Sequence, residues 1–513
     1  MNMPNFDDLM RRQVDEALQW LRQHAAAGAQ LHGDSRTLAA GDVFFAYAVE
    51  GADSRPHIAA AFEGGASGVL YQPEGFAGRV DPARSLAVPA LDRLAGEIAS
   101  RWYGAPSEAM RMIGVTGTNG KTSTSQWIAA AMTALGEPCA VIGTLGSGMW
   151  GHLTHTGFTT PDAPQTQRSL AQLRAAGAQA CAMEVSSHAL HQGRVHGTAF
   201  DIAVFTNLTQ DHLDYHHTFE AYEAAKAKLF DWPTLRAAVI NRDDAAGRRL
   251  IAHTQPRLPT IVYGIGVASD APSAHAALVA TNVRATATGT AFHLASDWGA
   301  AEVEVGTLGE FNVSNLLGVL GALLAADVPL ADALAQLSKL EPVHGRMQRL
   351  GGRLANDEPL VVVDYAHTPD ALEKTLDALR PIAQARGGKL VCMFGCGGDR
   401  DATKRPLMGA IAERLADAVV VTSDNPRSED PRSIIDQIVA GMTHPDQARC
   451  VEDRANAILQ AVRGAAREDV VVLAGKGHEA TQEIMGKKRV FSDQDHARLA
   501  LAARATYSRG GEQ

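Results

Sequence analysis

The stretch between Met112 and Ser125 constrains the fold of this chain most, because its pattern predicts an apolar strand, a glycine-rich turn and a helix start. Gly117 and Gly120 leave room for backbone N–H groups to approach a phosphate chain without an intervening Cβ. Lys121 adds a positive charge, and Thr122 carries a hydroxyl of the kind that binds Mg²⁺ in phosphate-binding loops. The positive end of the following helix dipole would face the same anion. The stretch therefore predicts a nucleotide phosphate site at the end of a buried strand.

This loop departs from the common nucleotide pattern G-x-x-x-x-G-K-[ST] at one position. Val115 stands where that pattern has its first glycine, and Gly114 stands one residue earlier. An ordinary glycine-rich connection between a strand and a helix is the alternative interpretation. The run Gly-Lys-Thr at the predicted helix start favours phosphate binding, with Gly114, Gly117 and Gly120 all easing the approach of the anion.

The length and composition bound the class of protein. A chain of 513 residues exceeds one hydrophobic core, so we expect about three domains of ~150 residues each. A net charge of −10 without a run of lysines and arginines argues against nucleic-acid binding. Five scattered cysteines are typical of a reducing compartment. The N-terminus lacks the apolar segment of a signal peptide, and the most apolar run, Leu316 to Val328, is too short to span a bilayer. We therefore expect a soluble cytoplasmic enzyme.

Apolar strands alternate with helical segments along most of the chain, which predicts an α/β fold with doubly wound, largely parallel sheets. We expect three domains, at residues 1–104, 105–340 and 341–513, with a first helix over 6–27 and β-hairpins within 241–305. Sheets of this type bind ligands at the carboxyl ends of their strands. The strands that matter for the motifs are expected at 112–115, 140–144, 180–184, 202–205, 237–240, 360–364, 389–394, 418–422 and 470–474.

Two acidic motifs follow predicted strands of the middle domain. Glu184 ends an apolar strand, where an uncompensated carboxylate is costly and a metal ion would compensate it. A salt bridge at the strand end is the alternative. Asp211, His212, Asp214 and His216 then crowd into one short segment after the next strand. His212 is a candidate Mg²⁺ ligand beside oxygen ligands, with a purely structural histidine as the alternative.

Three polar residues lie near the predicted boundary between the middle and last domains. Asn312 stands at the opening of a predicted helix and is a candidate N-cap. Arg346 and Asp364 suit a triphosphate and a ribose hydroxyl, respectively. The alternatives for these two residues are an inter-domain salt bridge for the arginine and a helix cap for the aspartate.

Loops of the last domain follow predicted strands and carry complementary charges. Asp424 and Arg427 lie on a turn stiffened by Pro426, and together they could hold an ammonium and a carboxylate. Glu479, in a later loop, adds a second acceptor for the ammonium. The glycine-rich turn at 395–401 is too weakly patterned to indicate a dinucleotide. The set favours a site for an amino-acid zwitterion over independent surface turns.

These motifs occur together in an order that resembles the Mur ligase family, which also contains the folylpolyglutamate synthases. In chain order they are Gly-Thr-Asn-Gly-Lys-Thr, Met-Glu-Val-Ser-Ser-His, Asp-His-Leu-Asp-Tyr-His, Glu-Ala-Ala-Lys, His-Gly-Arg, Asp-Tyr-Ala-His-Thr-Pro, Asp-Asn-Pro-Arg and Gly-Lys-Gly-His-Glu. The resemblance spans nearly the whole chain and is looser before residue 104. The motif Asp-Asn-Pro-Arg resembles the members that add meso-diaminopimelate rather than L-lysine.

The resemblance implies an ATP-dependent amide ligase of peptidoglycan precursor synthesis. Its substrates would be UDP-MurNAc-L-Ala-D-Glu, meso-diaminopimelate and ATP, with Mg²⁺ as cofactor. The γ-phosphate would pass to the D-Glu carboxylate, and the diaminopimelate amine would attack the resulting acyl phosphate. The first domain would bind the uridine nucleotide, the P-loop-type middle domain ATP and the Rossmann-like last domain the amino acid. We expect a monomer.

The resemblance also implies the metal ligands. Thr122 and Glu184 would hold one Mg²⁺ ion, and His212 with Lys226 would hold another. A carbamate formed from CO₂ would turn the amine of Lys226 into a carboxylate-like ligand. Composition alone predicts instead that Lys226 and Lys228 are solvated helix charges. The catalytic residues implied are Lys121, Glu184, His212 and Lys226.

Three sets of binding residues follow from the resemblance. ATP would be bound by Gly117, Thr118, Asn119, Gly120, Lys121, Thr122, Ser123, Arg346, Asp364 and, near the adenine, Asn312. The UDP-MurNAc-dipeptide would be bound by Ser35 at the uridine end and by Thr159, Thr160, Ser186, Gln192 and Arg194. Diaminopimelate would be bound by Arg400, Asp424, Asn425, Pro426, Arg427, Gly475 and Glu479.

The chain departs from the family pattern in two places. The usual His-Gln-Ala stretch of the uridine site is replaced by Glu50-Gly51-Ala52, which leaves the contacts of that segment open. Ser123 after the loop threonine is a milder change.

Two other functions compete with the diaminopimelate ligase. A ligase that adds lysine or extends folate with glutamate is the first, and the pair Asp424–Asn425 with Arg427 argues against it. A non-catalytic nucleotide-binding module is the second. The joint presence of Lys121 and Glu184 with the other two catalytic residues argues against that module.

Overall fold

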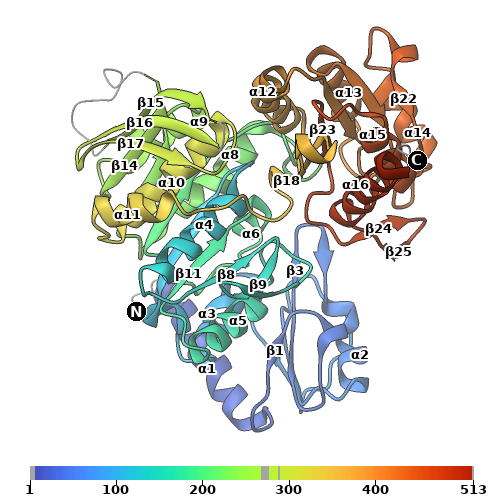
Figure 1. Cartoon of the computed structure of the whole chain (residues 1–513). Helices are drawn as coiled ribbons and strands as arrows, with labels where there is room; N and C mark the ends of the chain where they lie inside the picture. The colour runs from blue at the N-terminus through green and yellow to red at the C-terminus, as the bar shows by residue number, and fades with distance from the viewer. Residues whose placement is uncertain (1–5, 267–276, 287–288, 511–513) are drawn as a thin grey trace.

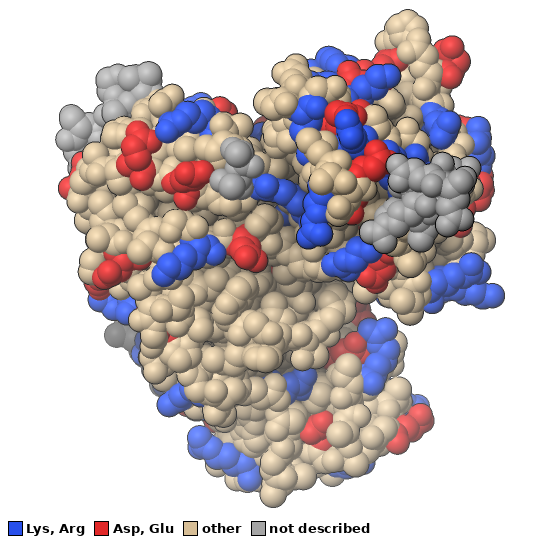
Figure 2. Space-filling model, in the orientation of Figure 1, with Lys and Arg blue, Asp and Glu red and all other residues tan. Residues whose placement is uncertain are grey.

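The computed structural model describes residues 6–266, 277–286 and 289–510, and it has three lobes, each built on its own main sheet (Figure 1). The predicted α/β class with mostly parallel sheets is confirmed. Acidic and basic side chains are interspersed on the face that Figure 2 shows. Among the described residues, no helix is both long and apolar enough to cross a membrane. The domain limits at residues 104 and 340 stay predictions.

The N-terminal lobe has a four-stranded parallel sheet in the order β1-β2-β5-β6. Its first helix buries Val14, Ala17, Leu18 and Leu21, which recur at helical spacing and form one apolar face. That helix ends at His24 rather than at the predicted residue 27. The elements are α1 (Phe6–His24), β1 (Leu31–His32), η1 (Ser35–Thr37), β2 (Val43–Ala46), β3 (Ala48–Val49), β4 (Ala52–Asp53), η2 (Arg55–His57), α2 (Ile58–Glu63), β5 (Gly68–Tyr71), β6 (Ser85–Ala87) and α3 (Leu91–Trp102).

The central lobe has an eleven-stranded sheet in the order β10-β9-β8-β11-β7-β12-β13-β14-β15-β16-β17. The seven strands β8-β11-β7-β12-β13-β14-β15 pair in parallel. Antiparallel β9 and β10 extend one edge of the sheet, and antiparallel β16 and β17 extend the other. Antiparallel β15–β16–β17 confirm the predicted hairpins, although residues 267–276 and 287–288 of that prediction lie outside the described part. The elements are η3 (Pro106–Ala109), β7 (Arg111–Thr116), α4 (Lys121–Ala134), β8 (Cys139–Gly143), β9 (Gly146–Met149), β10 (His152–Thr154), α5 (Ala163–Ala175), β11 (Ala180–Glu184), α6 (Ser187–His191), β12 (Ile202–Phe205), α7 (Leu213–His216), α8 (Phe219–Ala227), η4 (Lys228–Asp231), β13 (Ala237–Asn241), α9 (Ala245–Thr254), β14 (Thr260–Ile265), β15 (Ala277–Ala285), β16 (Thr290–Ser296), β17 (Gly299–Val305), α10 (Glu310–Ala325) and α11 (Leu330–Leu337).

The C-terminal lobe has a six-stranded sheet in the order β18-β19-β23-β20-β21-β22, in which β18 alone is antiparallel to its neighbour. Valine- and leucine-rich strands are buried between helices on both faces, as a parallel sheet requires. The elements are β18 (Gln348–Gly351), η6 (Leu354–Asn356), β19 (Leu360–Asp364), α12 (Pro369–Arg386), β20 (Leu390–Phe394), α13 (Lys404–Leu415), β21 (Ala418–Val421), α14 (Pro431–Val439), η7 (Pro445–Gln447), β22 (Arg449–Cys450), α15 (Arg454–Gly464), β23 (Val470–Ala474), β24 (Thr481–Ile484), β25 (Lys487–Val490) and α16 (Asp493–Gly510).

The register of the central sheet brings three predicted motifs to one edge. Strand β7 lies between β11 and β12, with Val115 opposite Glu184 and Thr116 opposite Phe205. All three strands are parallel, so their carboxyl ends meet. The glycine-rich loop, the strand-end Glu184 and the segment after β12 are therefore neighbours, as the sequence predicted.

Candidate active site

The loop after β7 turns through two positions that suit glycine. Gly117 has a φ of +146° and Gly120 a φ of +86°, values that side chains disfavour. A Cβ on Gly117 would lie 1.9 Å from Thr206 Oγ1, and one on Gly120 would lie 2.2 Å from Asn315 Oδ1. The loop is thus packed against its neighbours with room for backbone only.

Gly114 has a different role from the one predicted. It lies inside β7, and a Cβ there would lie 3.1 Å from the Phe200 ring. The predicted contribution of Gly114 to phosphate approach is therefore wrong, because a glycine within the strand makes room for core packing and does not open the loop.

Lys121 lies over the loop at the first position of α4. Its Nζ donates to the carbonyl oxygens of Gly117, at 2.9 Å, and Thr118, at 2.8 Å. Burial lowers the pKa of Lys121, and the nearby carboxylates of Glu184 and Asp211 oppose that shift. The cation and the N-terminus of α4 thus converge on one point, which is where an anion would be stabilised.

The segment after β12 braces this loop, a contact that the sequence did not predict. The Thr118 backbone N–H donates to the Asn207 carbonyl at 2.8 Å, and the Asn119 N–H donates to Asn207 Oδ1 at 2.9 Å. The Thr206 hydroxyl donates to the Asn119 carbonyl at 2.6 Å. Ser123 lies in the first turn of α4 and lines the adjoining cavity. These hydrogen bonds therefore tie the loop to the segment after β12.

Glu184 is fully buried and is held by hydroxyl and amide groups. Its Oε2 accepts from Thr122 Oγ1 and Thr144 Oγ1, both at 3.0 Å, and its Oε1 accepts from the Thr144 N–H at 2.8 Å. Within the part of the chain that the structure describes, no ion pair involves this carboxylate. The alternative of a salt-bridged glutamate is therefore wrong, and an anionic oxygen faces the loop threonine.

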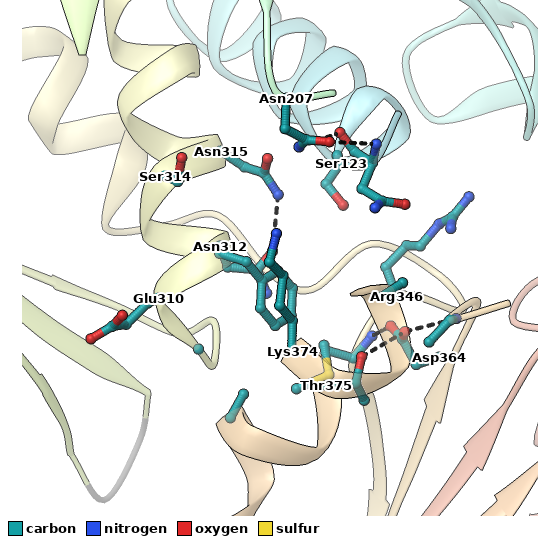
Figure 3. Close-up of a pocket in the computed structure, with 18 of the residues that line it drawn as sticks. Ser123, Asn207, Glu310, Asn312, Ser314, Asn315, Arg346, Asp364, Lys374 and Thr375 are labelled. Atoms are coloured by element: carbon teal, nitrogen blue, oxygen red, sulfur yellow. Dashed lines mark hydrogen bonds between the residues drawn. The ribbon is translucent and has the colours of Figure 1, made fainter. Parts of the chain in front are cut away.

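A cavity of about 720 Å³ opens beside the loop and joins the central and C-terminal lobes. Its walls include Lys121, Thr122, Glu184 and His212 from the central lobe. Figure 3 shows the polar side chains of α10 on one side and those of the C-terminal lobe on the other. Twelve of the residues implied by the resemblance line this cavity: Thr118, Asn119, Gly120, Lys121, Thr122, Ser123, Thr159, Glu184, His212, Asn312, Arg346 and Asp364.

Asn312 does not cap α10. Gly309 occupies the N-cap position, and Asn312 lies in the first turn, where its Nδ2 donates to the Leu308 carbonyl at 2.8 Å. The side chain lines the cavity beside Asn315 (Figure 3). The capping hypothesis is therefore wrong for this residue.

Arg346 reaches from the C-terminal lobe to the phosphate loop. Its Nη2 donates to Thr122 Oγ1 at 3.2 Å, and its guanidinium lies 4.2 Å from the centre of the Tyr365 ring. Its Nε is buried and has no hydrogen-bond partner among the described residues. No carboxylate pairs with Arg346 in that same part of the chain, so the alternative of an inter-domain salt bridge is wrong. An unpartnered guanidinium nitrogen beside the loop suits an anionic ligand.

Asp364 ends β19 and does not cap a helix. It accepts from the Met347 N–H at 2.8 Å, the Ala366 N–H at 2.9 Å and Thr375 Oγ1 at 3.2 Å. Thr368 caps α12 instead. Burial raises the pKa of the Asp364 carboxyl, and the nearby Arg346 opposes that shift.

His212 lies on the cavity wall in a left-handed backbone conformation, with a φ of +55°. Its Nε2 is 3.4 Å from Asp211 Oδ2, and its ring meets that of His188 edge-on with centroids 4.8 Å apart. Desolvation lowers the pKa of His212 to about 4, although Asp211 opposes the shift. The imidazole is therefore neutral near pH 7 and can offer a lone pair.

Lys226 lies buried behind the phosphate loop. Its side chain is 2 % exposed, Nζ donates to the Gly117 carbonyl at 2.8 Å, and the ammonium position is 4.5 Å from the Tyr222 ring centre. Burial and the neighbouring Lys121 lower its pKa well below the ordinary lysine value. The prediction of a solvated charge is wrong for Lys226, whereas Lys228 is exposed as predicted.

Part of the set assigned to the UDP-MurNAc-dipeptide is linked by hydrogen bonds. Arg194 donates to Gln192 Oε1 at 2.8 Å and to the Thr160 carbonyl at 3.1 Å. Thr160 Oγ1 donates to the Glu184 carbonyl at 2.8 Å, which ties this set to the metal candidate. Thr159 contacts Thr144 through their hydroxyls, and Ser186 caps α6. Ser35 lies in η1 of the N-terminal lobe, and no hydrogen bond joins it to the others within the described ranges.

Glu50, in the segment that departs from the family pattern, still contacts the residues assigned to the UDP-MurNAc-dipeptide. The Glu50 carbonyl accepts from Gln192 Nε2 at 3.0 Å, and its carboxylate lies 3.4 Å from His191 Nδ1. The contact to Gln192 uses backbone, so it does not depend on the identity of the replaced side chain.

The amino-acid loops of the C-terminal lobe come together at the ends of β20, β21 and β23. Asn425 Nδ2 donates to Glu479 Oε2 at 2.7 Å, and Arg427 Nη1 donates to the Gly398 carbonyl at 2.7 Å. Gly475 has a φ of +110°, and a Cβ there would lie 2.7 Å from Asp424 Oδ2. Pro426 lies within the same turn. Asp424, Asn425 and Glu479 therefore lie together, whereas the printed contact of the Arg427 side chain is with the neighbouring loop at Gly398.

Two residues differ from the prediction of the diaminopimelate-binding set. Arg400 is exposed and donates to its neighbour's carbonyl, at Asp399, so the structure does not bring it into the cluster. Lys476 was missed, although it stands in the quoted motif Gly-Lys-Gly-His-Glu after a buried strand. The burial of Lys476 among hydrogen-bond acceptors would have identified it, but composition cannot reveal burial.

The chain is similar to known proteins over most of its length. The Mur ligase middle-domain model matches residues 115–323, and the "Mur ligase, glutamate ligase domain" model matches residues 345–477. A curated relative from Ralstonia nicotianae is 62 % identical over 95 % of this chain and 96 % of its own length. The chain belongs to the Mur ligase family. That relative, and another from Pseudomonas aeruginosa that is 52 % identical over 92 % of this chain and 94 % of its own length, are both named UDP-N-acetylmuramoyl-L-alanyl-D-glutamate--2,6-diaminopimelate ligase.

Solved Mur ligase structures agree with the fold. A structure with the same diaminopimelate ligase name is 37 % identical, has a TM-score of 0.64 and covers 93 % of this chain and 95 % of its own. A folylpolyglutamate synthase from Mycobacterium tuberculosis, at 18 % identity and a TM-score of 0.60, covers 83 % of this chain and 96 % of its own and supports the fold alone. The three-lobed Mur ligase architecture is therefore confirmed.

Proposed function

We propose that this Mur ligase couples ATP cleavage to the addition of meso-diaminopimelate to the D-Glu carboxylate of UDP-MurNAc-L-Ala-D-Glu. The observation that carries the proposal is the single cavity bordered by the phosphate loop, the buried Glu184 and the Arg346 side chain of another lobe. The names of relatives at 51–62 % identity support the choice of substrates. ADP and inorganic phosphate are the other products.

The residues of the loop fit the first step, transfer of the γ-phosphoryl group to the carboxylate. Two anions repel each other as they approach, so the site needs positive groups aimed at the transferring phosphate. The N-terminus of α4, the Lys121 ammonium and the Arg346 Nε, which has no partner among the described residues, supply them. The carboxylate oxygen attacks phosphorus, ADP leaves, and an acyl phosphate forms. The carboxylate carbon thereby gains a good leaving group.

The C-terminal loops fit the second step. Asp424 and Glu479 would hold an ammonium of diaminopimelate, and Arg427 would hold a carboxylate. With the amino acid held in place, its free amine attacks the acyl carbon through a tetrahedral intermediate. The amide bond forms, the carbon–oxygen bond to phosphate breaks, and phosphate leaves.

The residues at the loop fit a Mg²⁺ ion. Thr122 Oγ1 and Glu184 Oε2 are oxygens 3.0 Å apart at the cavity wall, and oxygen ligands suit this cation. Among the described residues, no three His, Cys, Asp or Glu side chains form a ready metal cluster. Substrate phosphates would supply further ligands to this ion, and His212 with a modified Lys226 would hold the second Mg²⁺ ion. When bound, the ion supplies charge neutralisation and positioning of the phosphates.

The environment of Lys226 fits carbamylation. CO₂ reacts with a neutral amine, and burial keeps the pKa of Lys226 well below the ordinary value. The amine nitrogen bonds to the carbon of CO₂ and releases a proton. Lys121, which disfavours a second ammonium there, would stabilise the resulting carbamate anion.

Compartment and assembly complete the proposal. ATP as co-substrate and five free thiols are consistent with a reducing cytoplasm. A monomer remains our prediction.

Phosphate release with a panel of amino acids tests this function. With ATP, Mg²⁺ and UDP-MurNAc-L-Ala-D-Glu, we expect release with meso-diaminopimelate and at least about 10²-fold slower release with L-lysine, which lacks the second carboxylate. Reactions without the amino acid, and with folate plus glutamate, are the controls. Faster release with lysine would contradict the substrate assignment, and no release with any mixture would favour a non-catalytic module.

A further inference from the structure

A buried lysine lies at the centre of the amino-acid loops. The side chain of Lys476 is 0 % exposed, and its Nζ donates to Glu479 Oε2 at 2.8 Å and to Asn425 Oδ1 at 3.1 Å. The same nitrogen lies 3.8 Å from Asp424 Oδ1. A buried ammonium is costly unless it is paired, so these acceptors explain how the lysine is tolerated. The two carboxylates proposed to bind the substrate ammonium already share one cation of the protein.

Lys476 also fixes the orientation of a neighbouring amide. Asn425 Oδ1 accepts from Lys476 and from the Glu483 N–H at 3.0 Å, while Asn425 Nδ2 donates to Glu479 Oε2 at 2.7 Å. A flipped amide would turn its NH₂ group toward the ammonium and lose both acceptor contacts. Lys476 thus holds Asn425, and Asn425 holds Glu479.

Among the four side chains Asp424, Arg427, Lys476 and Glu479, the charges balance because of this lysine. Asp424 and Glu479 contribute two negative charges, and Lys476 and Arg427 contribute two positive charges. Beneath them, Arg454 and Asp493 form a buried ion pair at 2.6 Å and add no net charge. Without Lys476 the set would carry a net charge of −1. Diaminopimelate has two carboxylates and two ammonium groups, whereas lysine has one carboxylate and is a net cation.

We propose that Lys476 is a specificity-determining positioning residue, whose buried ammonium neutralises the Asp424–Glu479 pair so that the subsite prefers a neutral diamino diacid over a cationic diamino monoacid. The substitution Lys476→Met would leave an uncompensated negative charge that attracts the cation. The proposal rests on the proposed function, because it deepens the choice of amino acid at that site.

The test is a series of charge variants assayed with both amino acids. The quantity measured is the ratio of kcat/KM for meso-diaminopimelate to kcat/KM for L-lysine. We expect K476M to lower this ratio at least about tenfold, and Glu479→Gln to raise it. The double variant K476M/E479Q, with its charge balance restored, should return toward the wild-type ratio. Lys389→Met, an exposed lysine at the opposite end of β20, is the matched control and should leave the ratio unchanged.

Folding and function are checked separately. ADP binding at the distant phosphate loop should be retained in K476M if the variant folds. If K476M does not fold, the double variant is compared with E479Q, and a lower ratio in the double variant supports the proposal. Equal losses with both amino acids, without a change in the ratio, would overturn it. A wild-type enzyme that releases no phosphate with any amino acid would refute the proposed function itself.

Discussion

Replacing Lys121 with methionine should reduce kcat/KM by about 10²–10³-fold, because one preorganised cation at the transferring phosphate is lost. The same side chain donates to the carbonyls of Gly117 and Thr118, so part of the effect will come from a less rigid loop. Steady-state phosphate release measures the change. Lys339→Met, an exposed lysine beyond α11, is the matched control and should retain wild-type activity.

The comparison of affinity with rate tells whether Lys121 acts on the transition state. An increase in the KM for ATP with an unchanged kcat would show that Lys121 contributes only to binding of the ground state. A fall in kcat fits a role in phosphoryl transfer. Activity within a factor of about two of wild type would contradict the assignment, since a cation at the reacting phosphate cannot be dispensable.

Lys226→Ala should reduce activity at least about 10²-fold, because the proposed metal ligand and the support of the loop are lost together. The buried ammonium position lies between the Gly117 carbonyl and the Tyr222 ring, so the substitution leaves a small space there. Added formate or acetate should enter it and restore part of the activity as a substitute for the carbamate. The exposed neighbour Lys228 supplies the control, K228A, which should behave as wild type.

Recovery of K226A activity by added carboxylates distinguishes a carbamylated Lys226 from an unmodified lysine with a structural role. Chloride at the same ionic strength should give no recovery. If K226A keeps full activity, or if carboxylates restore nothing, then the carbamate hypothesis is wrong. A fall in wild-type activity after removal of CO₂ and bicarbonate, reversed when they return, would support it independently.

The sequence predicted the strand framework well. Strands β11, β12, β19 and β23 begin and end where expected, because their apolar runs are bounded by polar or glycine-rich turns. Their parallel pairing brought the loops to common sheet edges, which is why motifs far apart in sequence could be placed together.

Side-chain environments were harder to predict. The helix containing Lys226 has a weak apolar pattern, so composition could not tell that Lys226 faces inward while Lys228 faces solvent. Asn312 resembles an N-cap by its position, but Gly309 occupies the N-cap position of α10. Gly114 looked like a loop glycine and is a packing glycine. Each error concerns which neighbour a residue meets, and only the tertiary structure determines that.

Lys476 is a further residue whose side-chain environment the sequence does not reveal. Its motif was visible, but a lysine between two glycines gives no sign of burial among Asn425, Asp424 and Glu479. The contacts depend on loops that lie about 50 residues apart in sequence and meet only because β21 and β23 share a sheet.

The central claim is that this Mur ligase activates a carboxylate as an acyl phosphate and passes it to diaminopimelate. The most direct test supplies UDP-MurNAc-L-Ala-D-Glu with both oxygens of the reacting carboxylate labelled with ¹⁸O. One labelled oxygen should leave with the inorganic phosphate and the other should stay in the new amide, both followed by mass spectrometry. Inorganic phosphate without label, or AMP and pyrophosphate in place of ADP, would contradict the account.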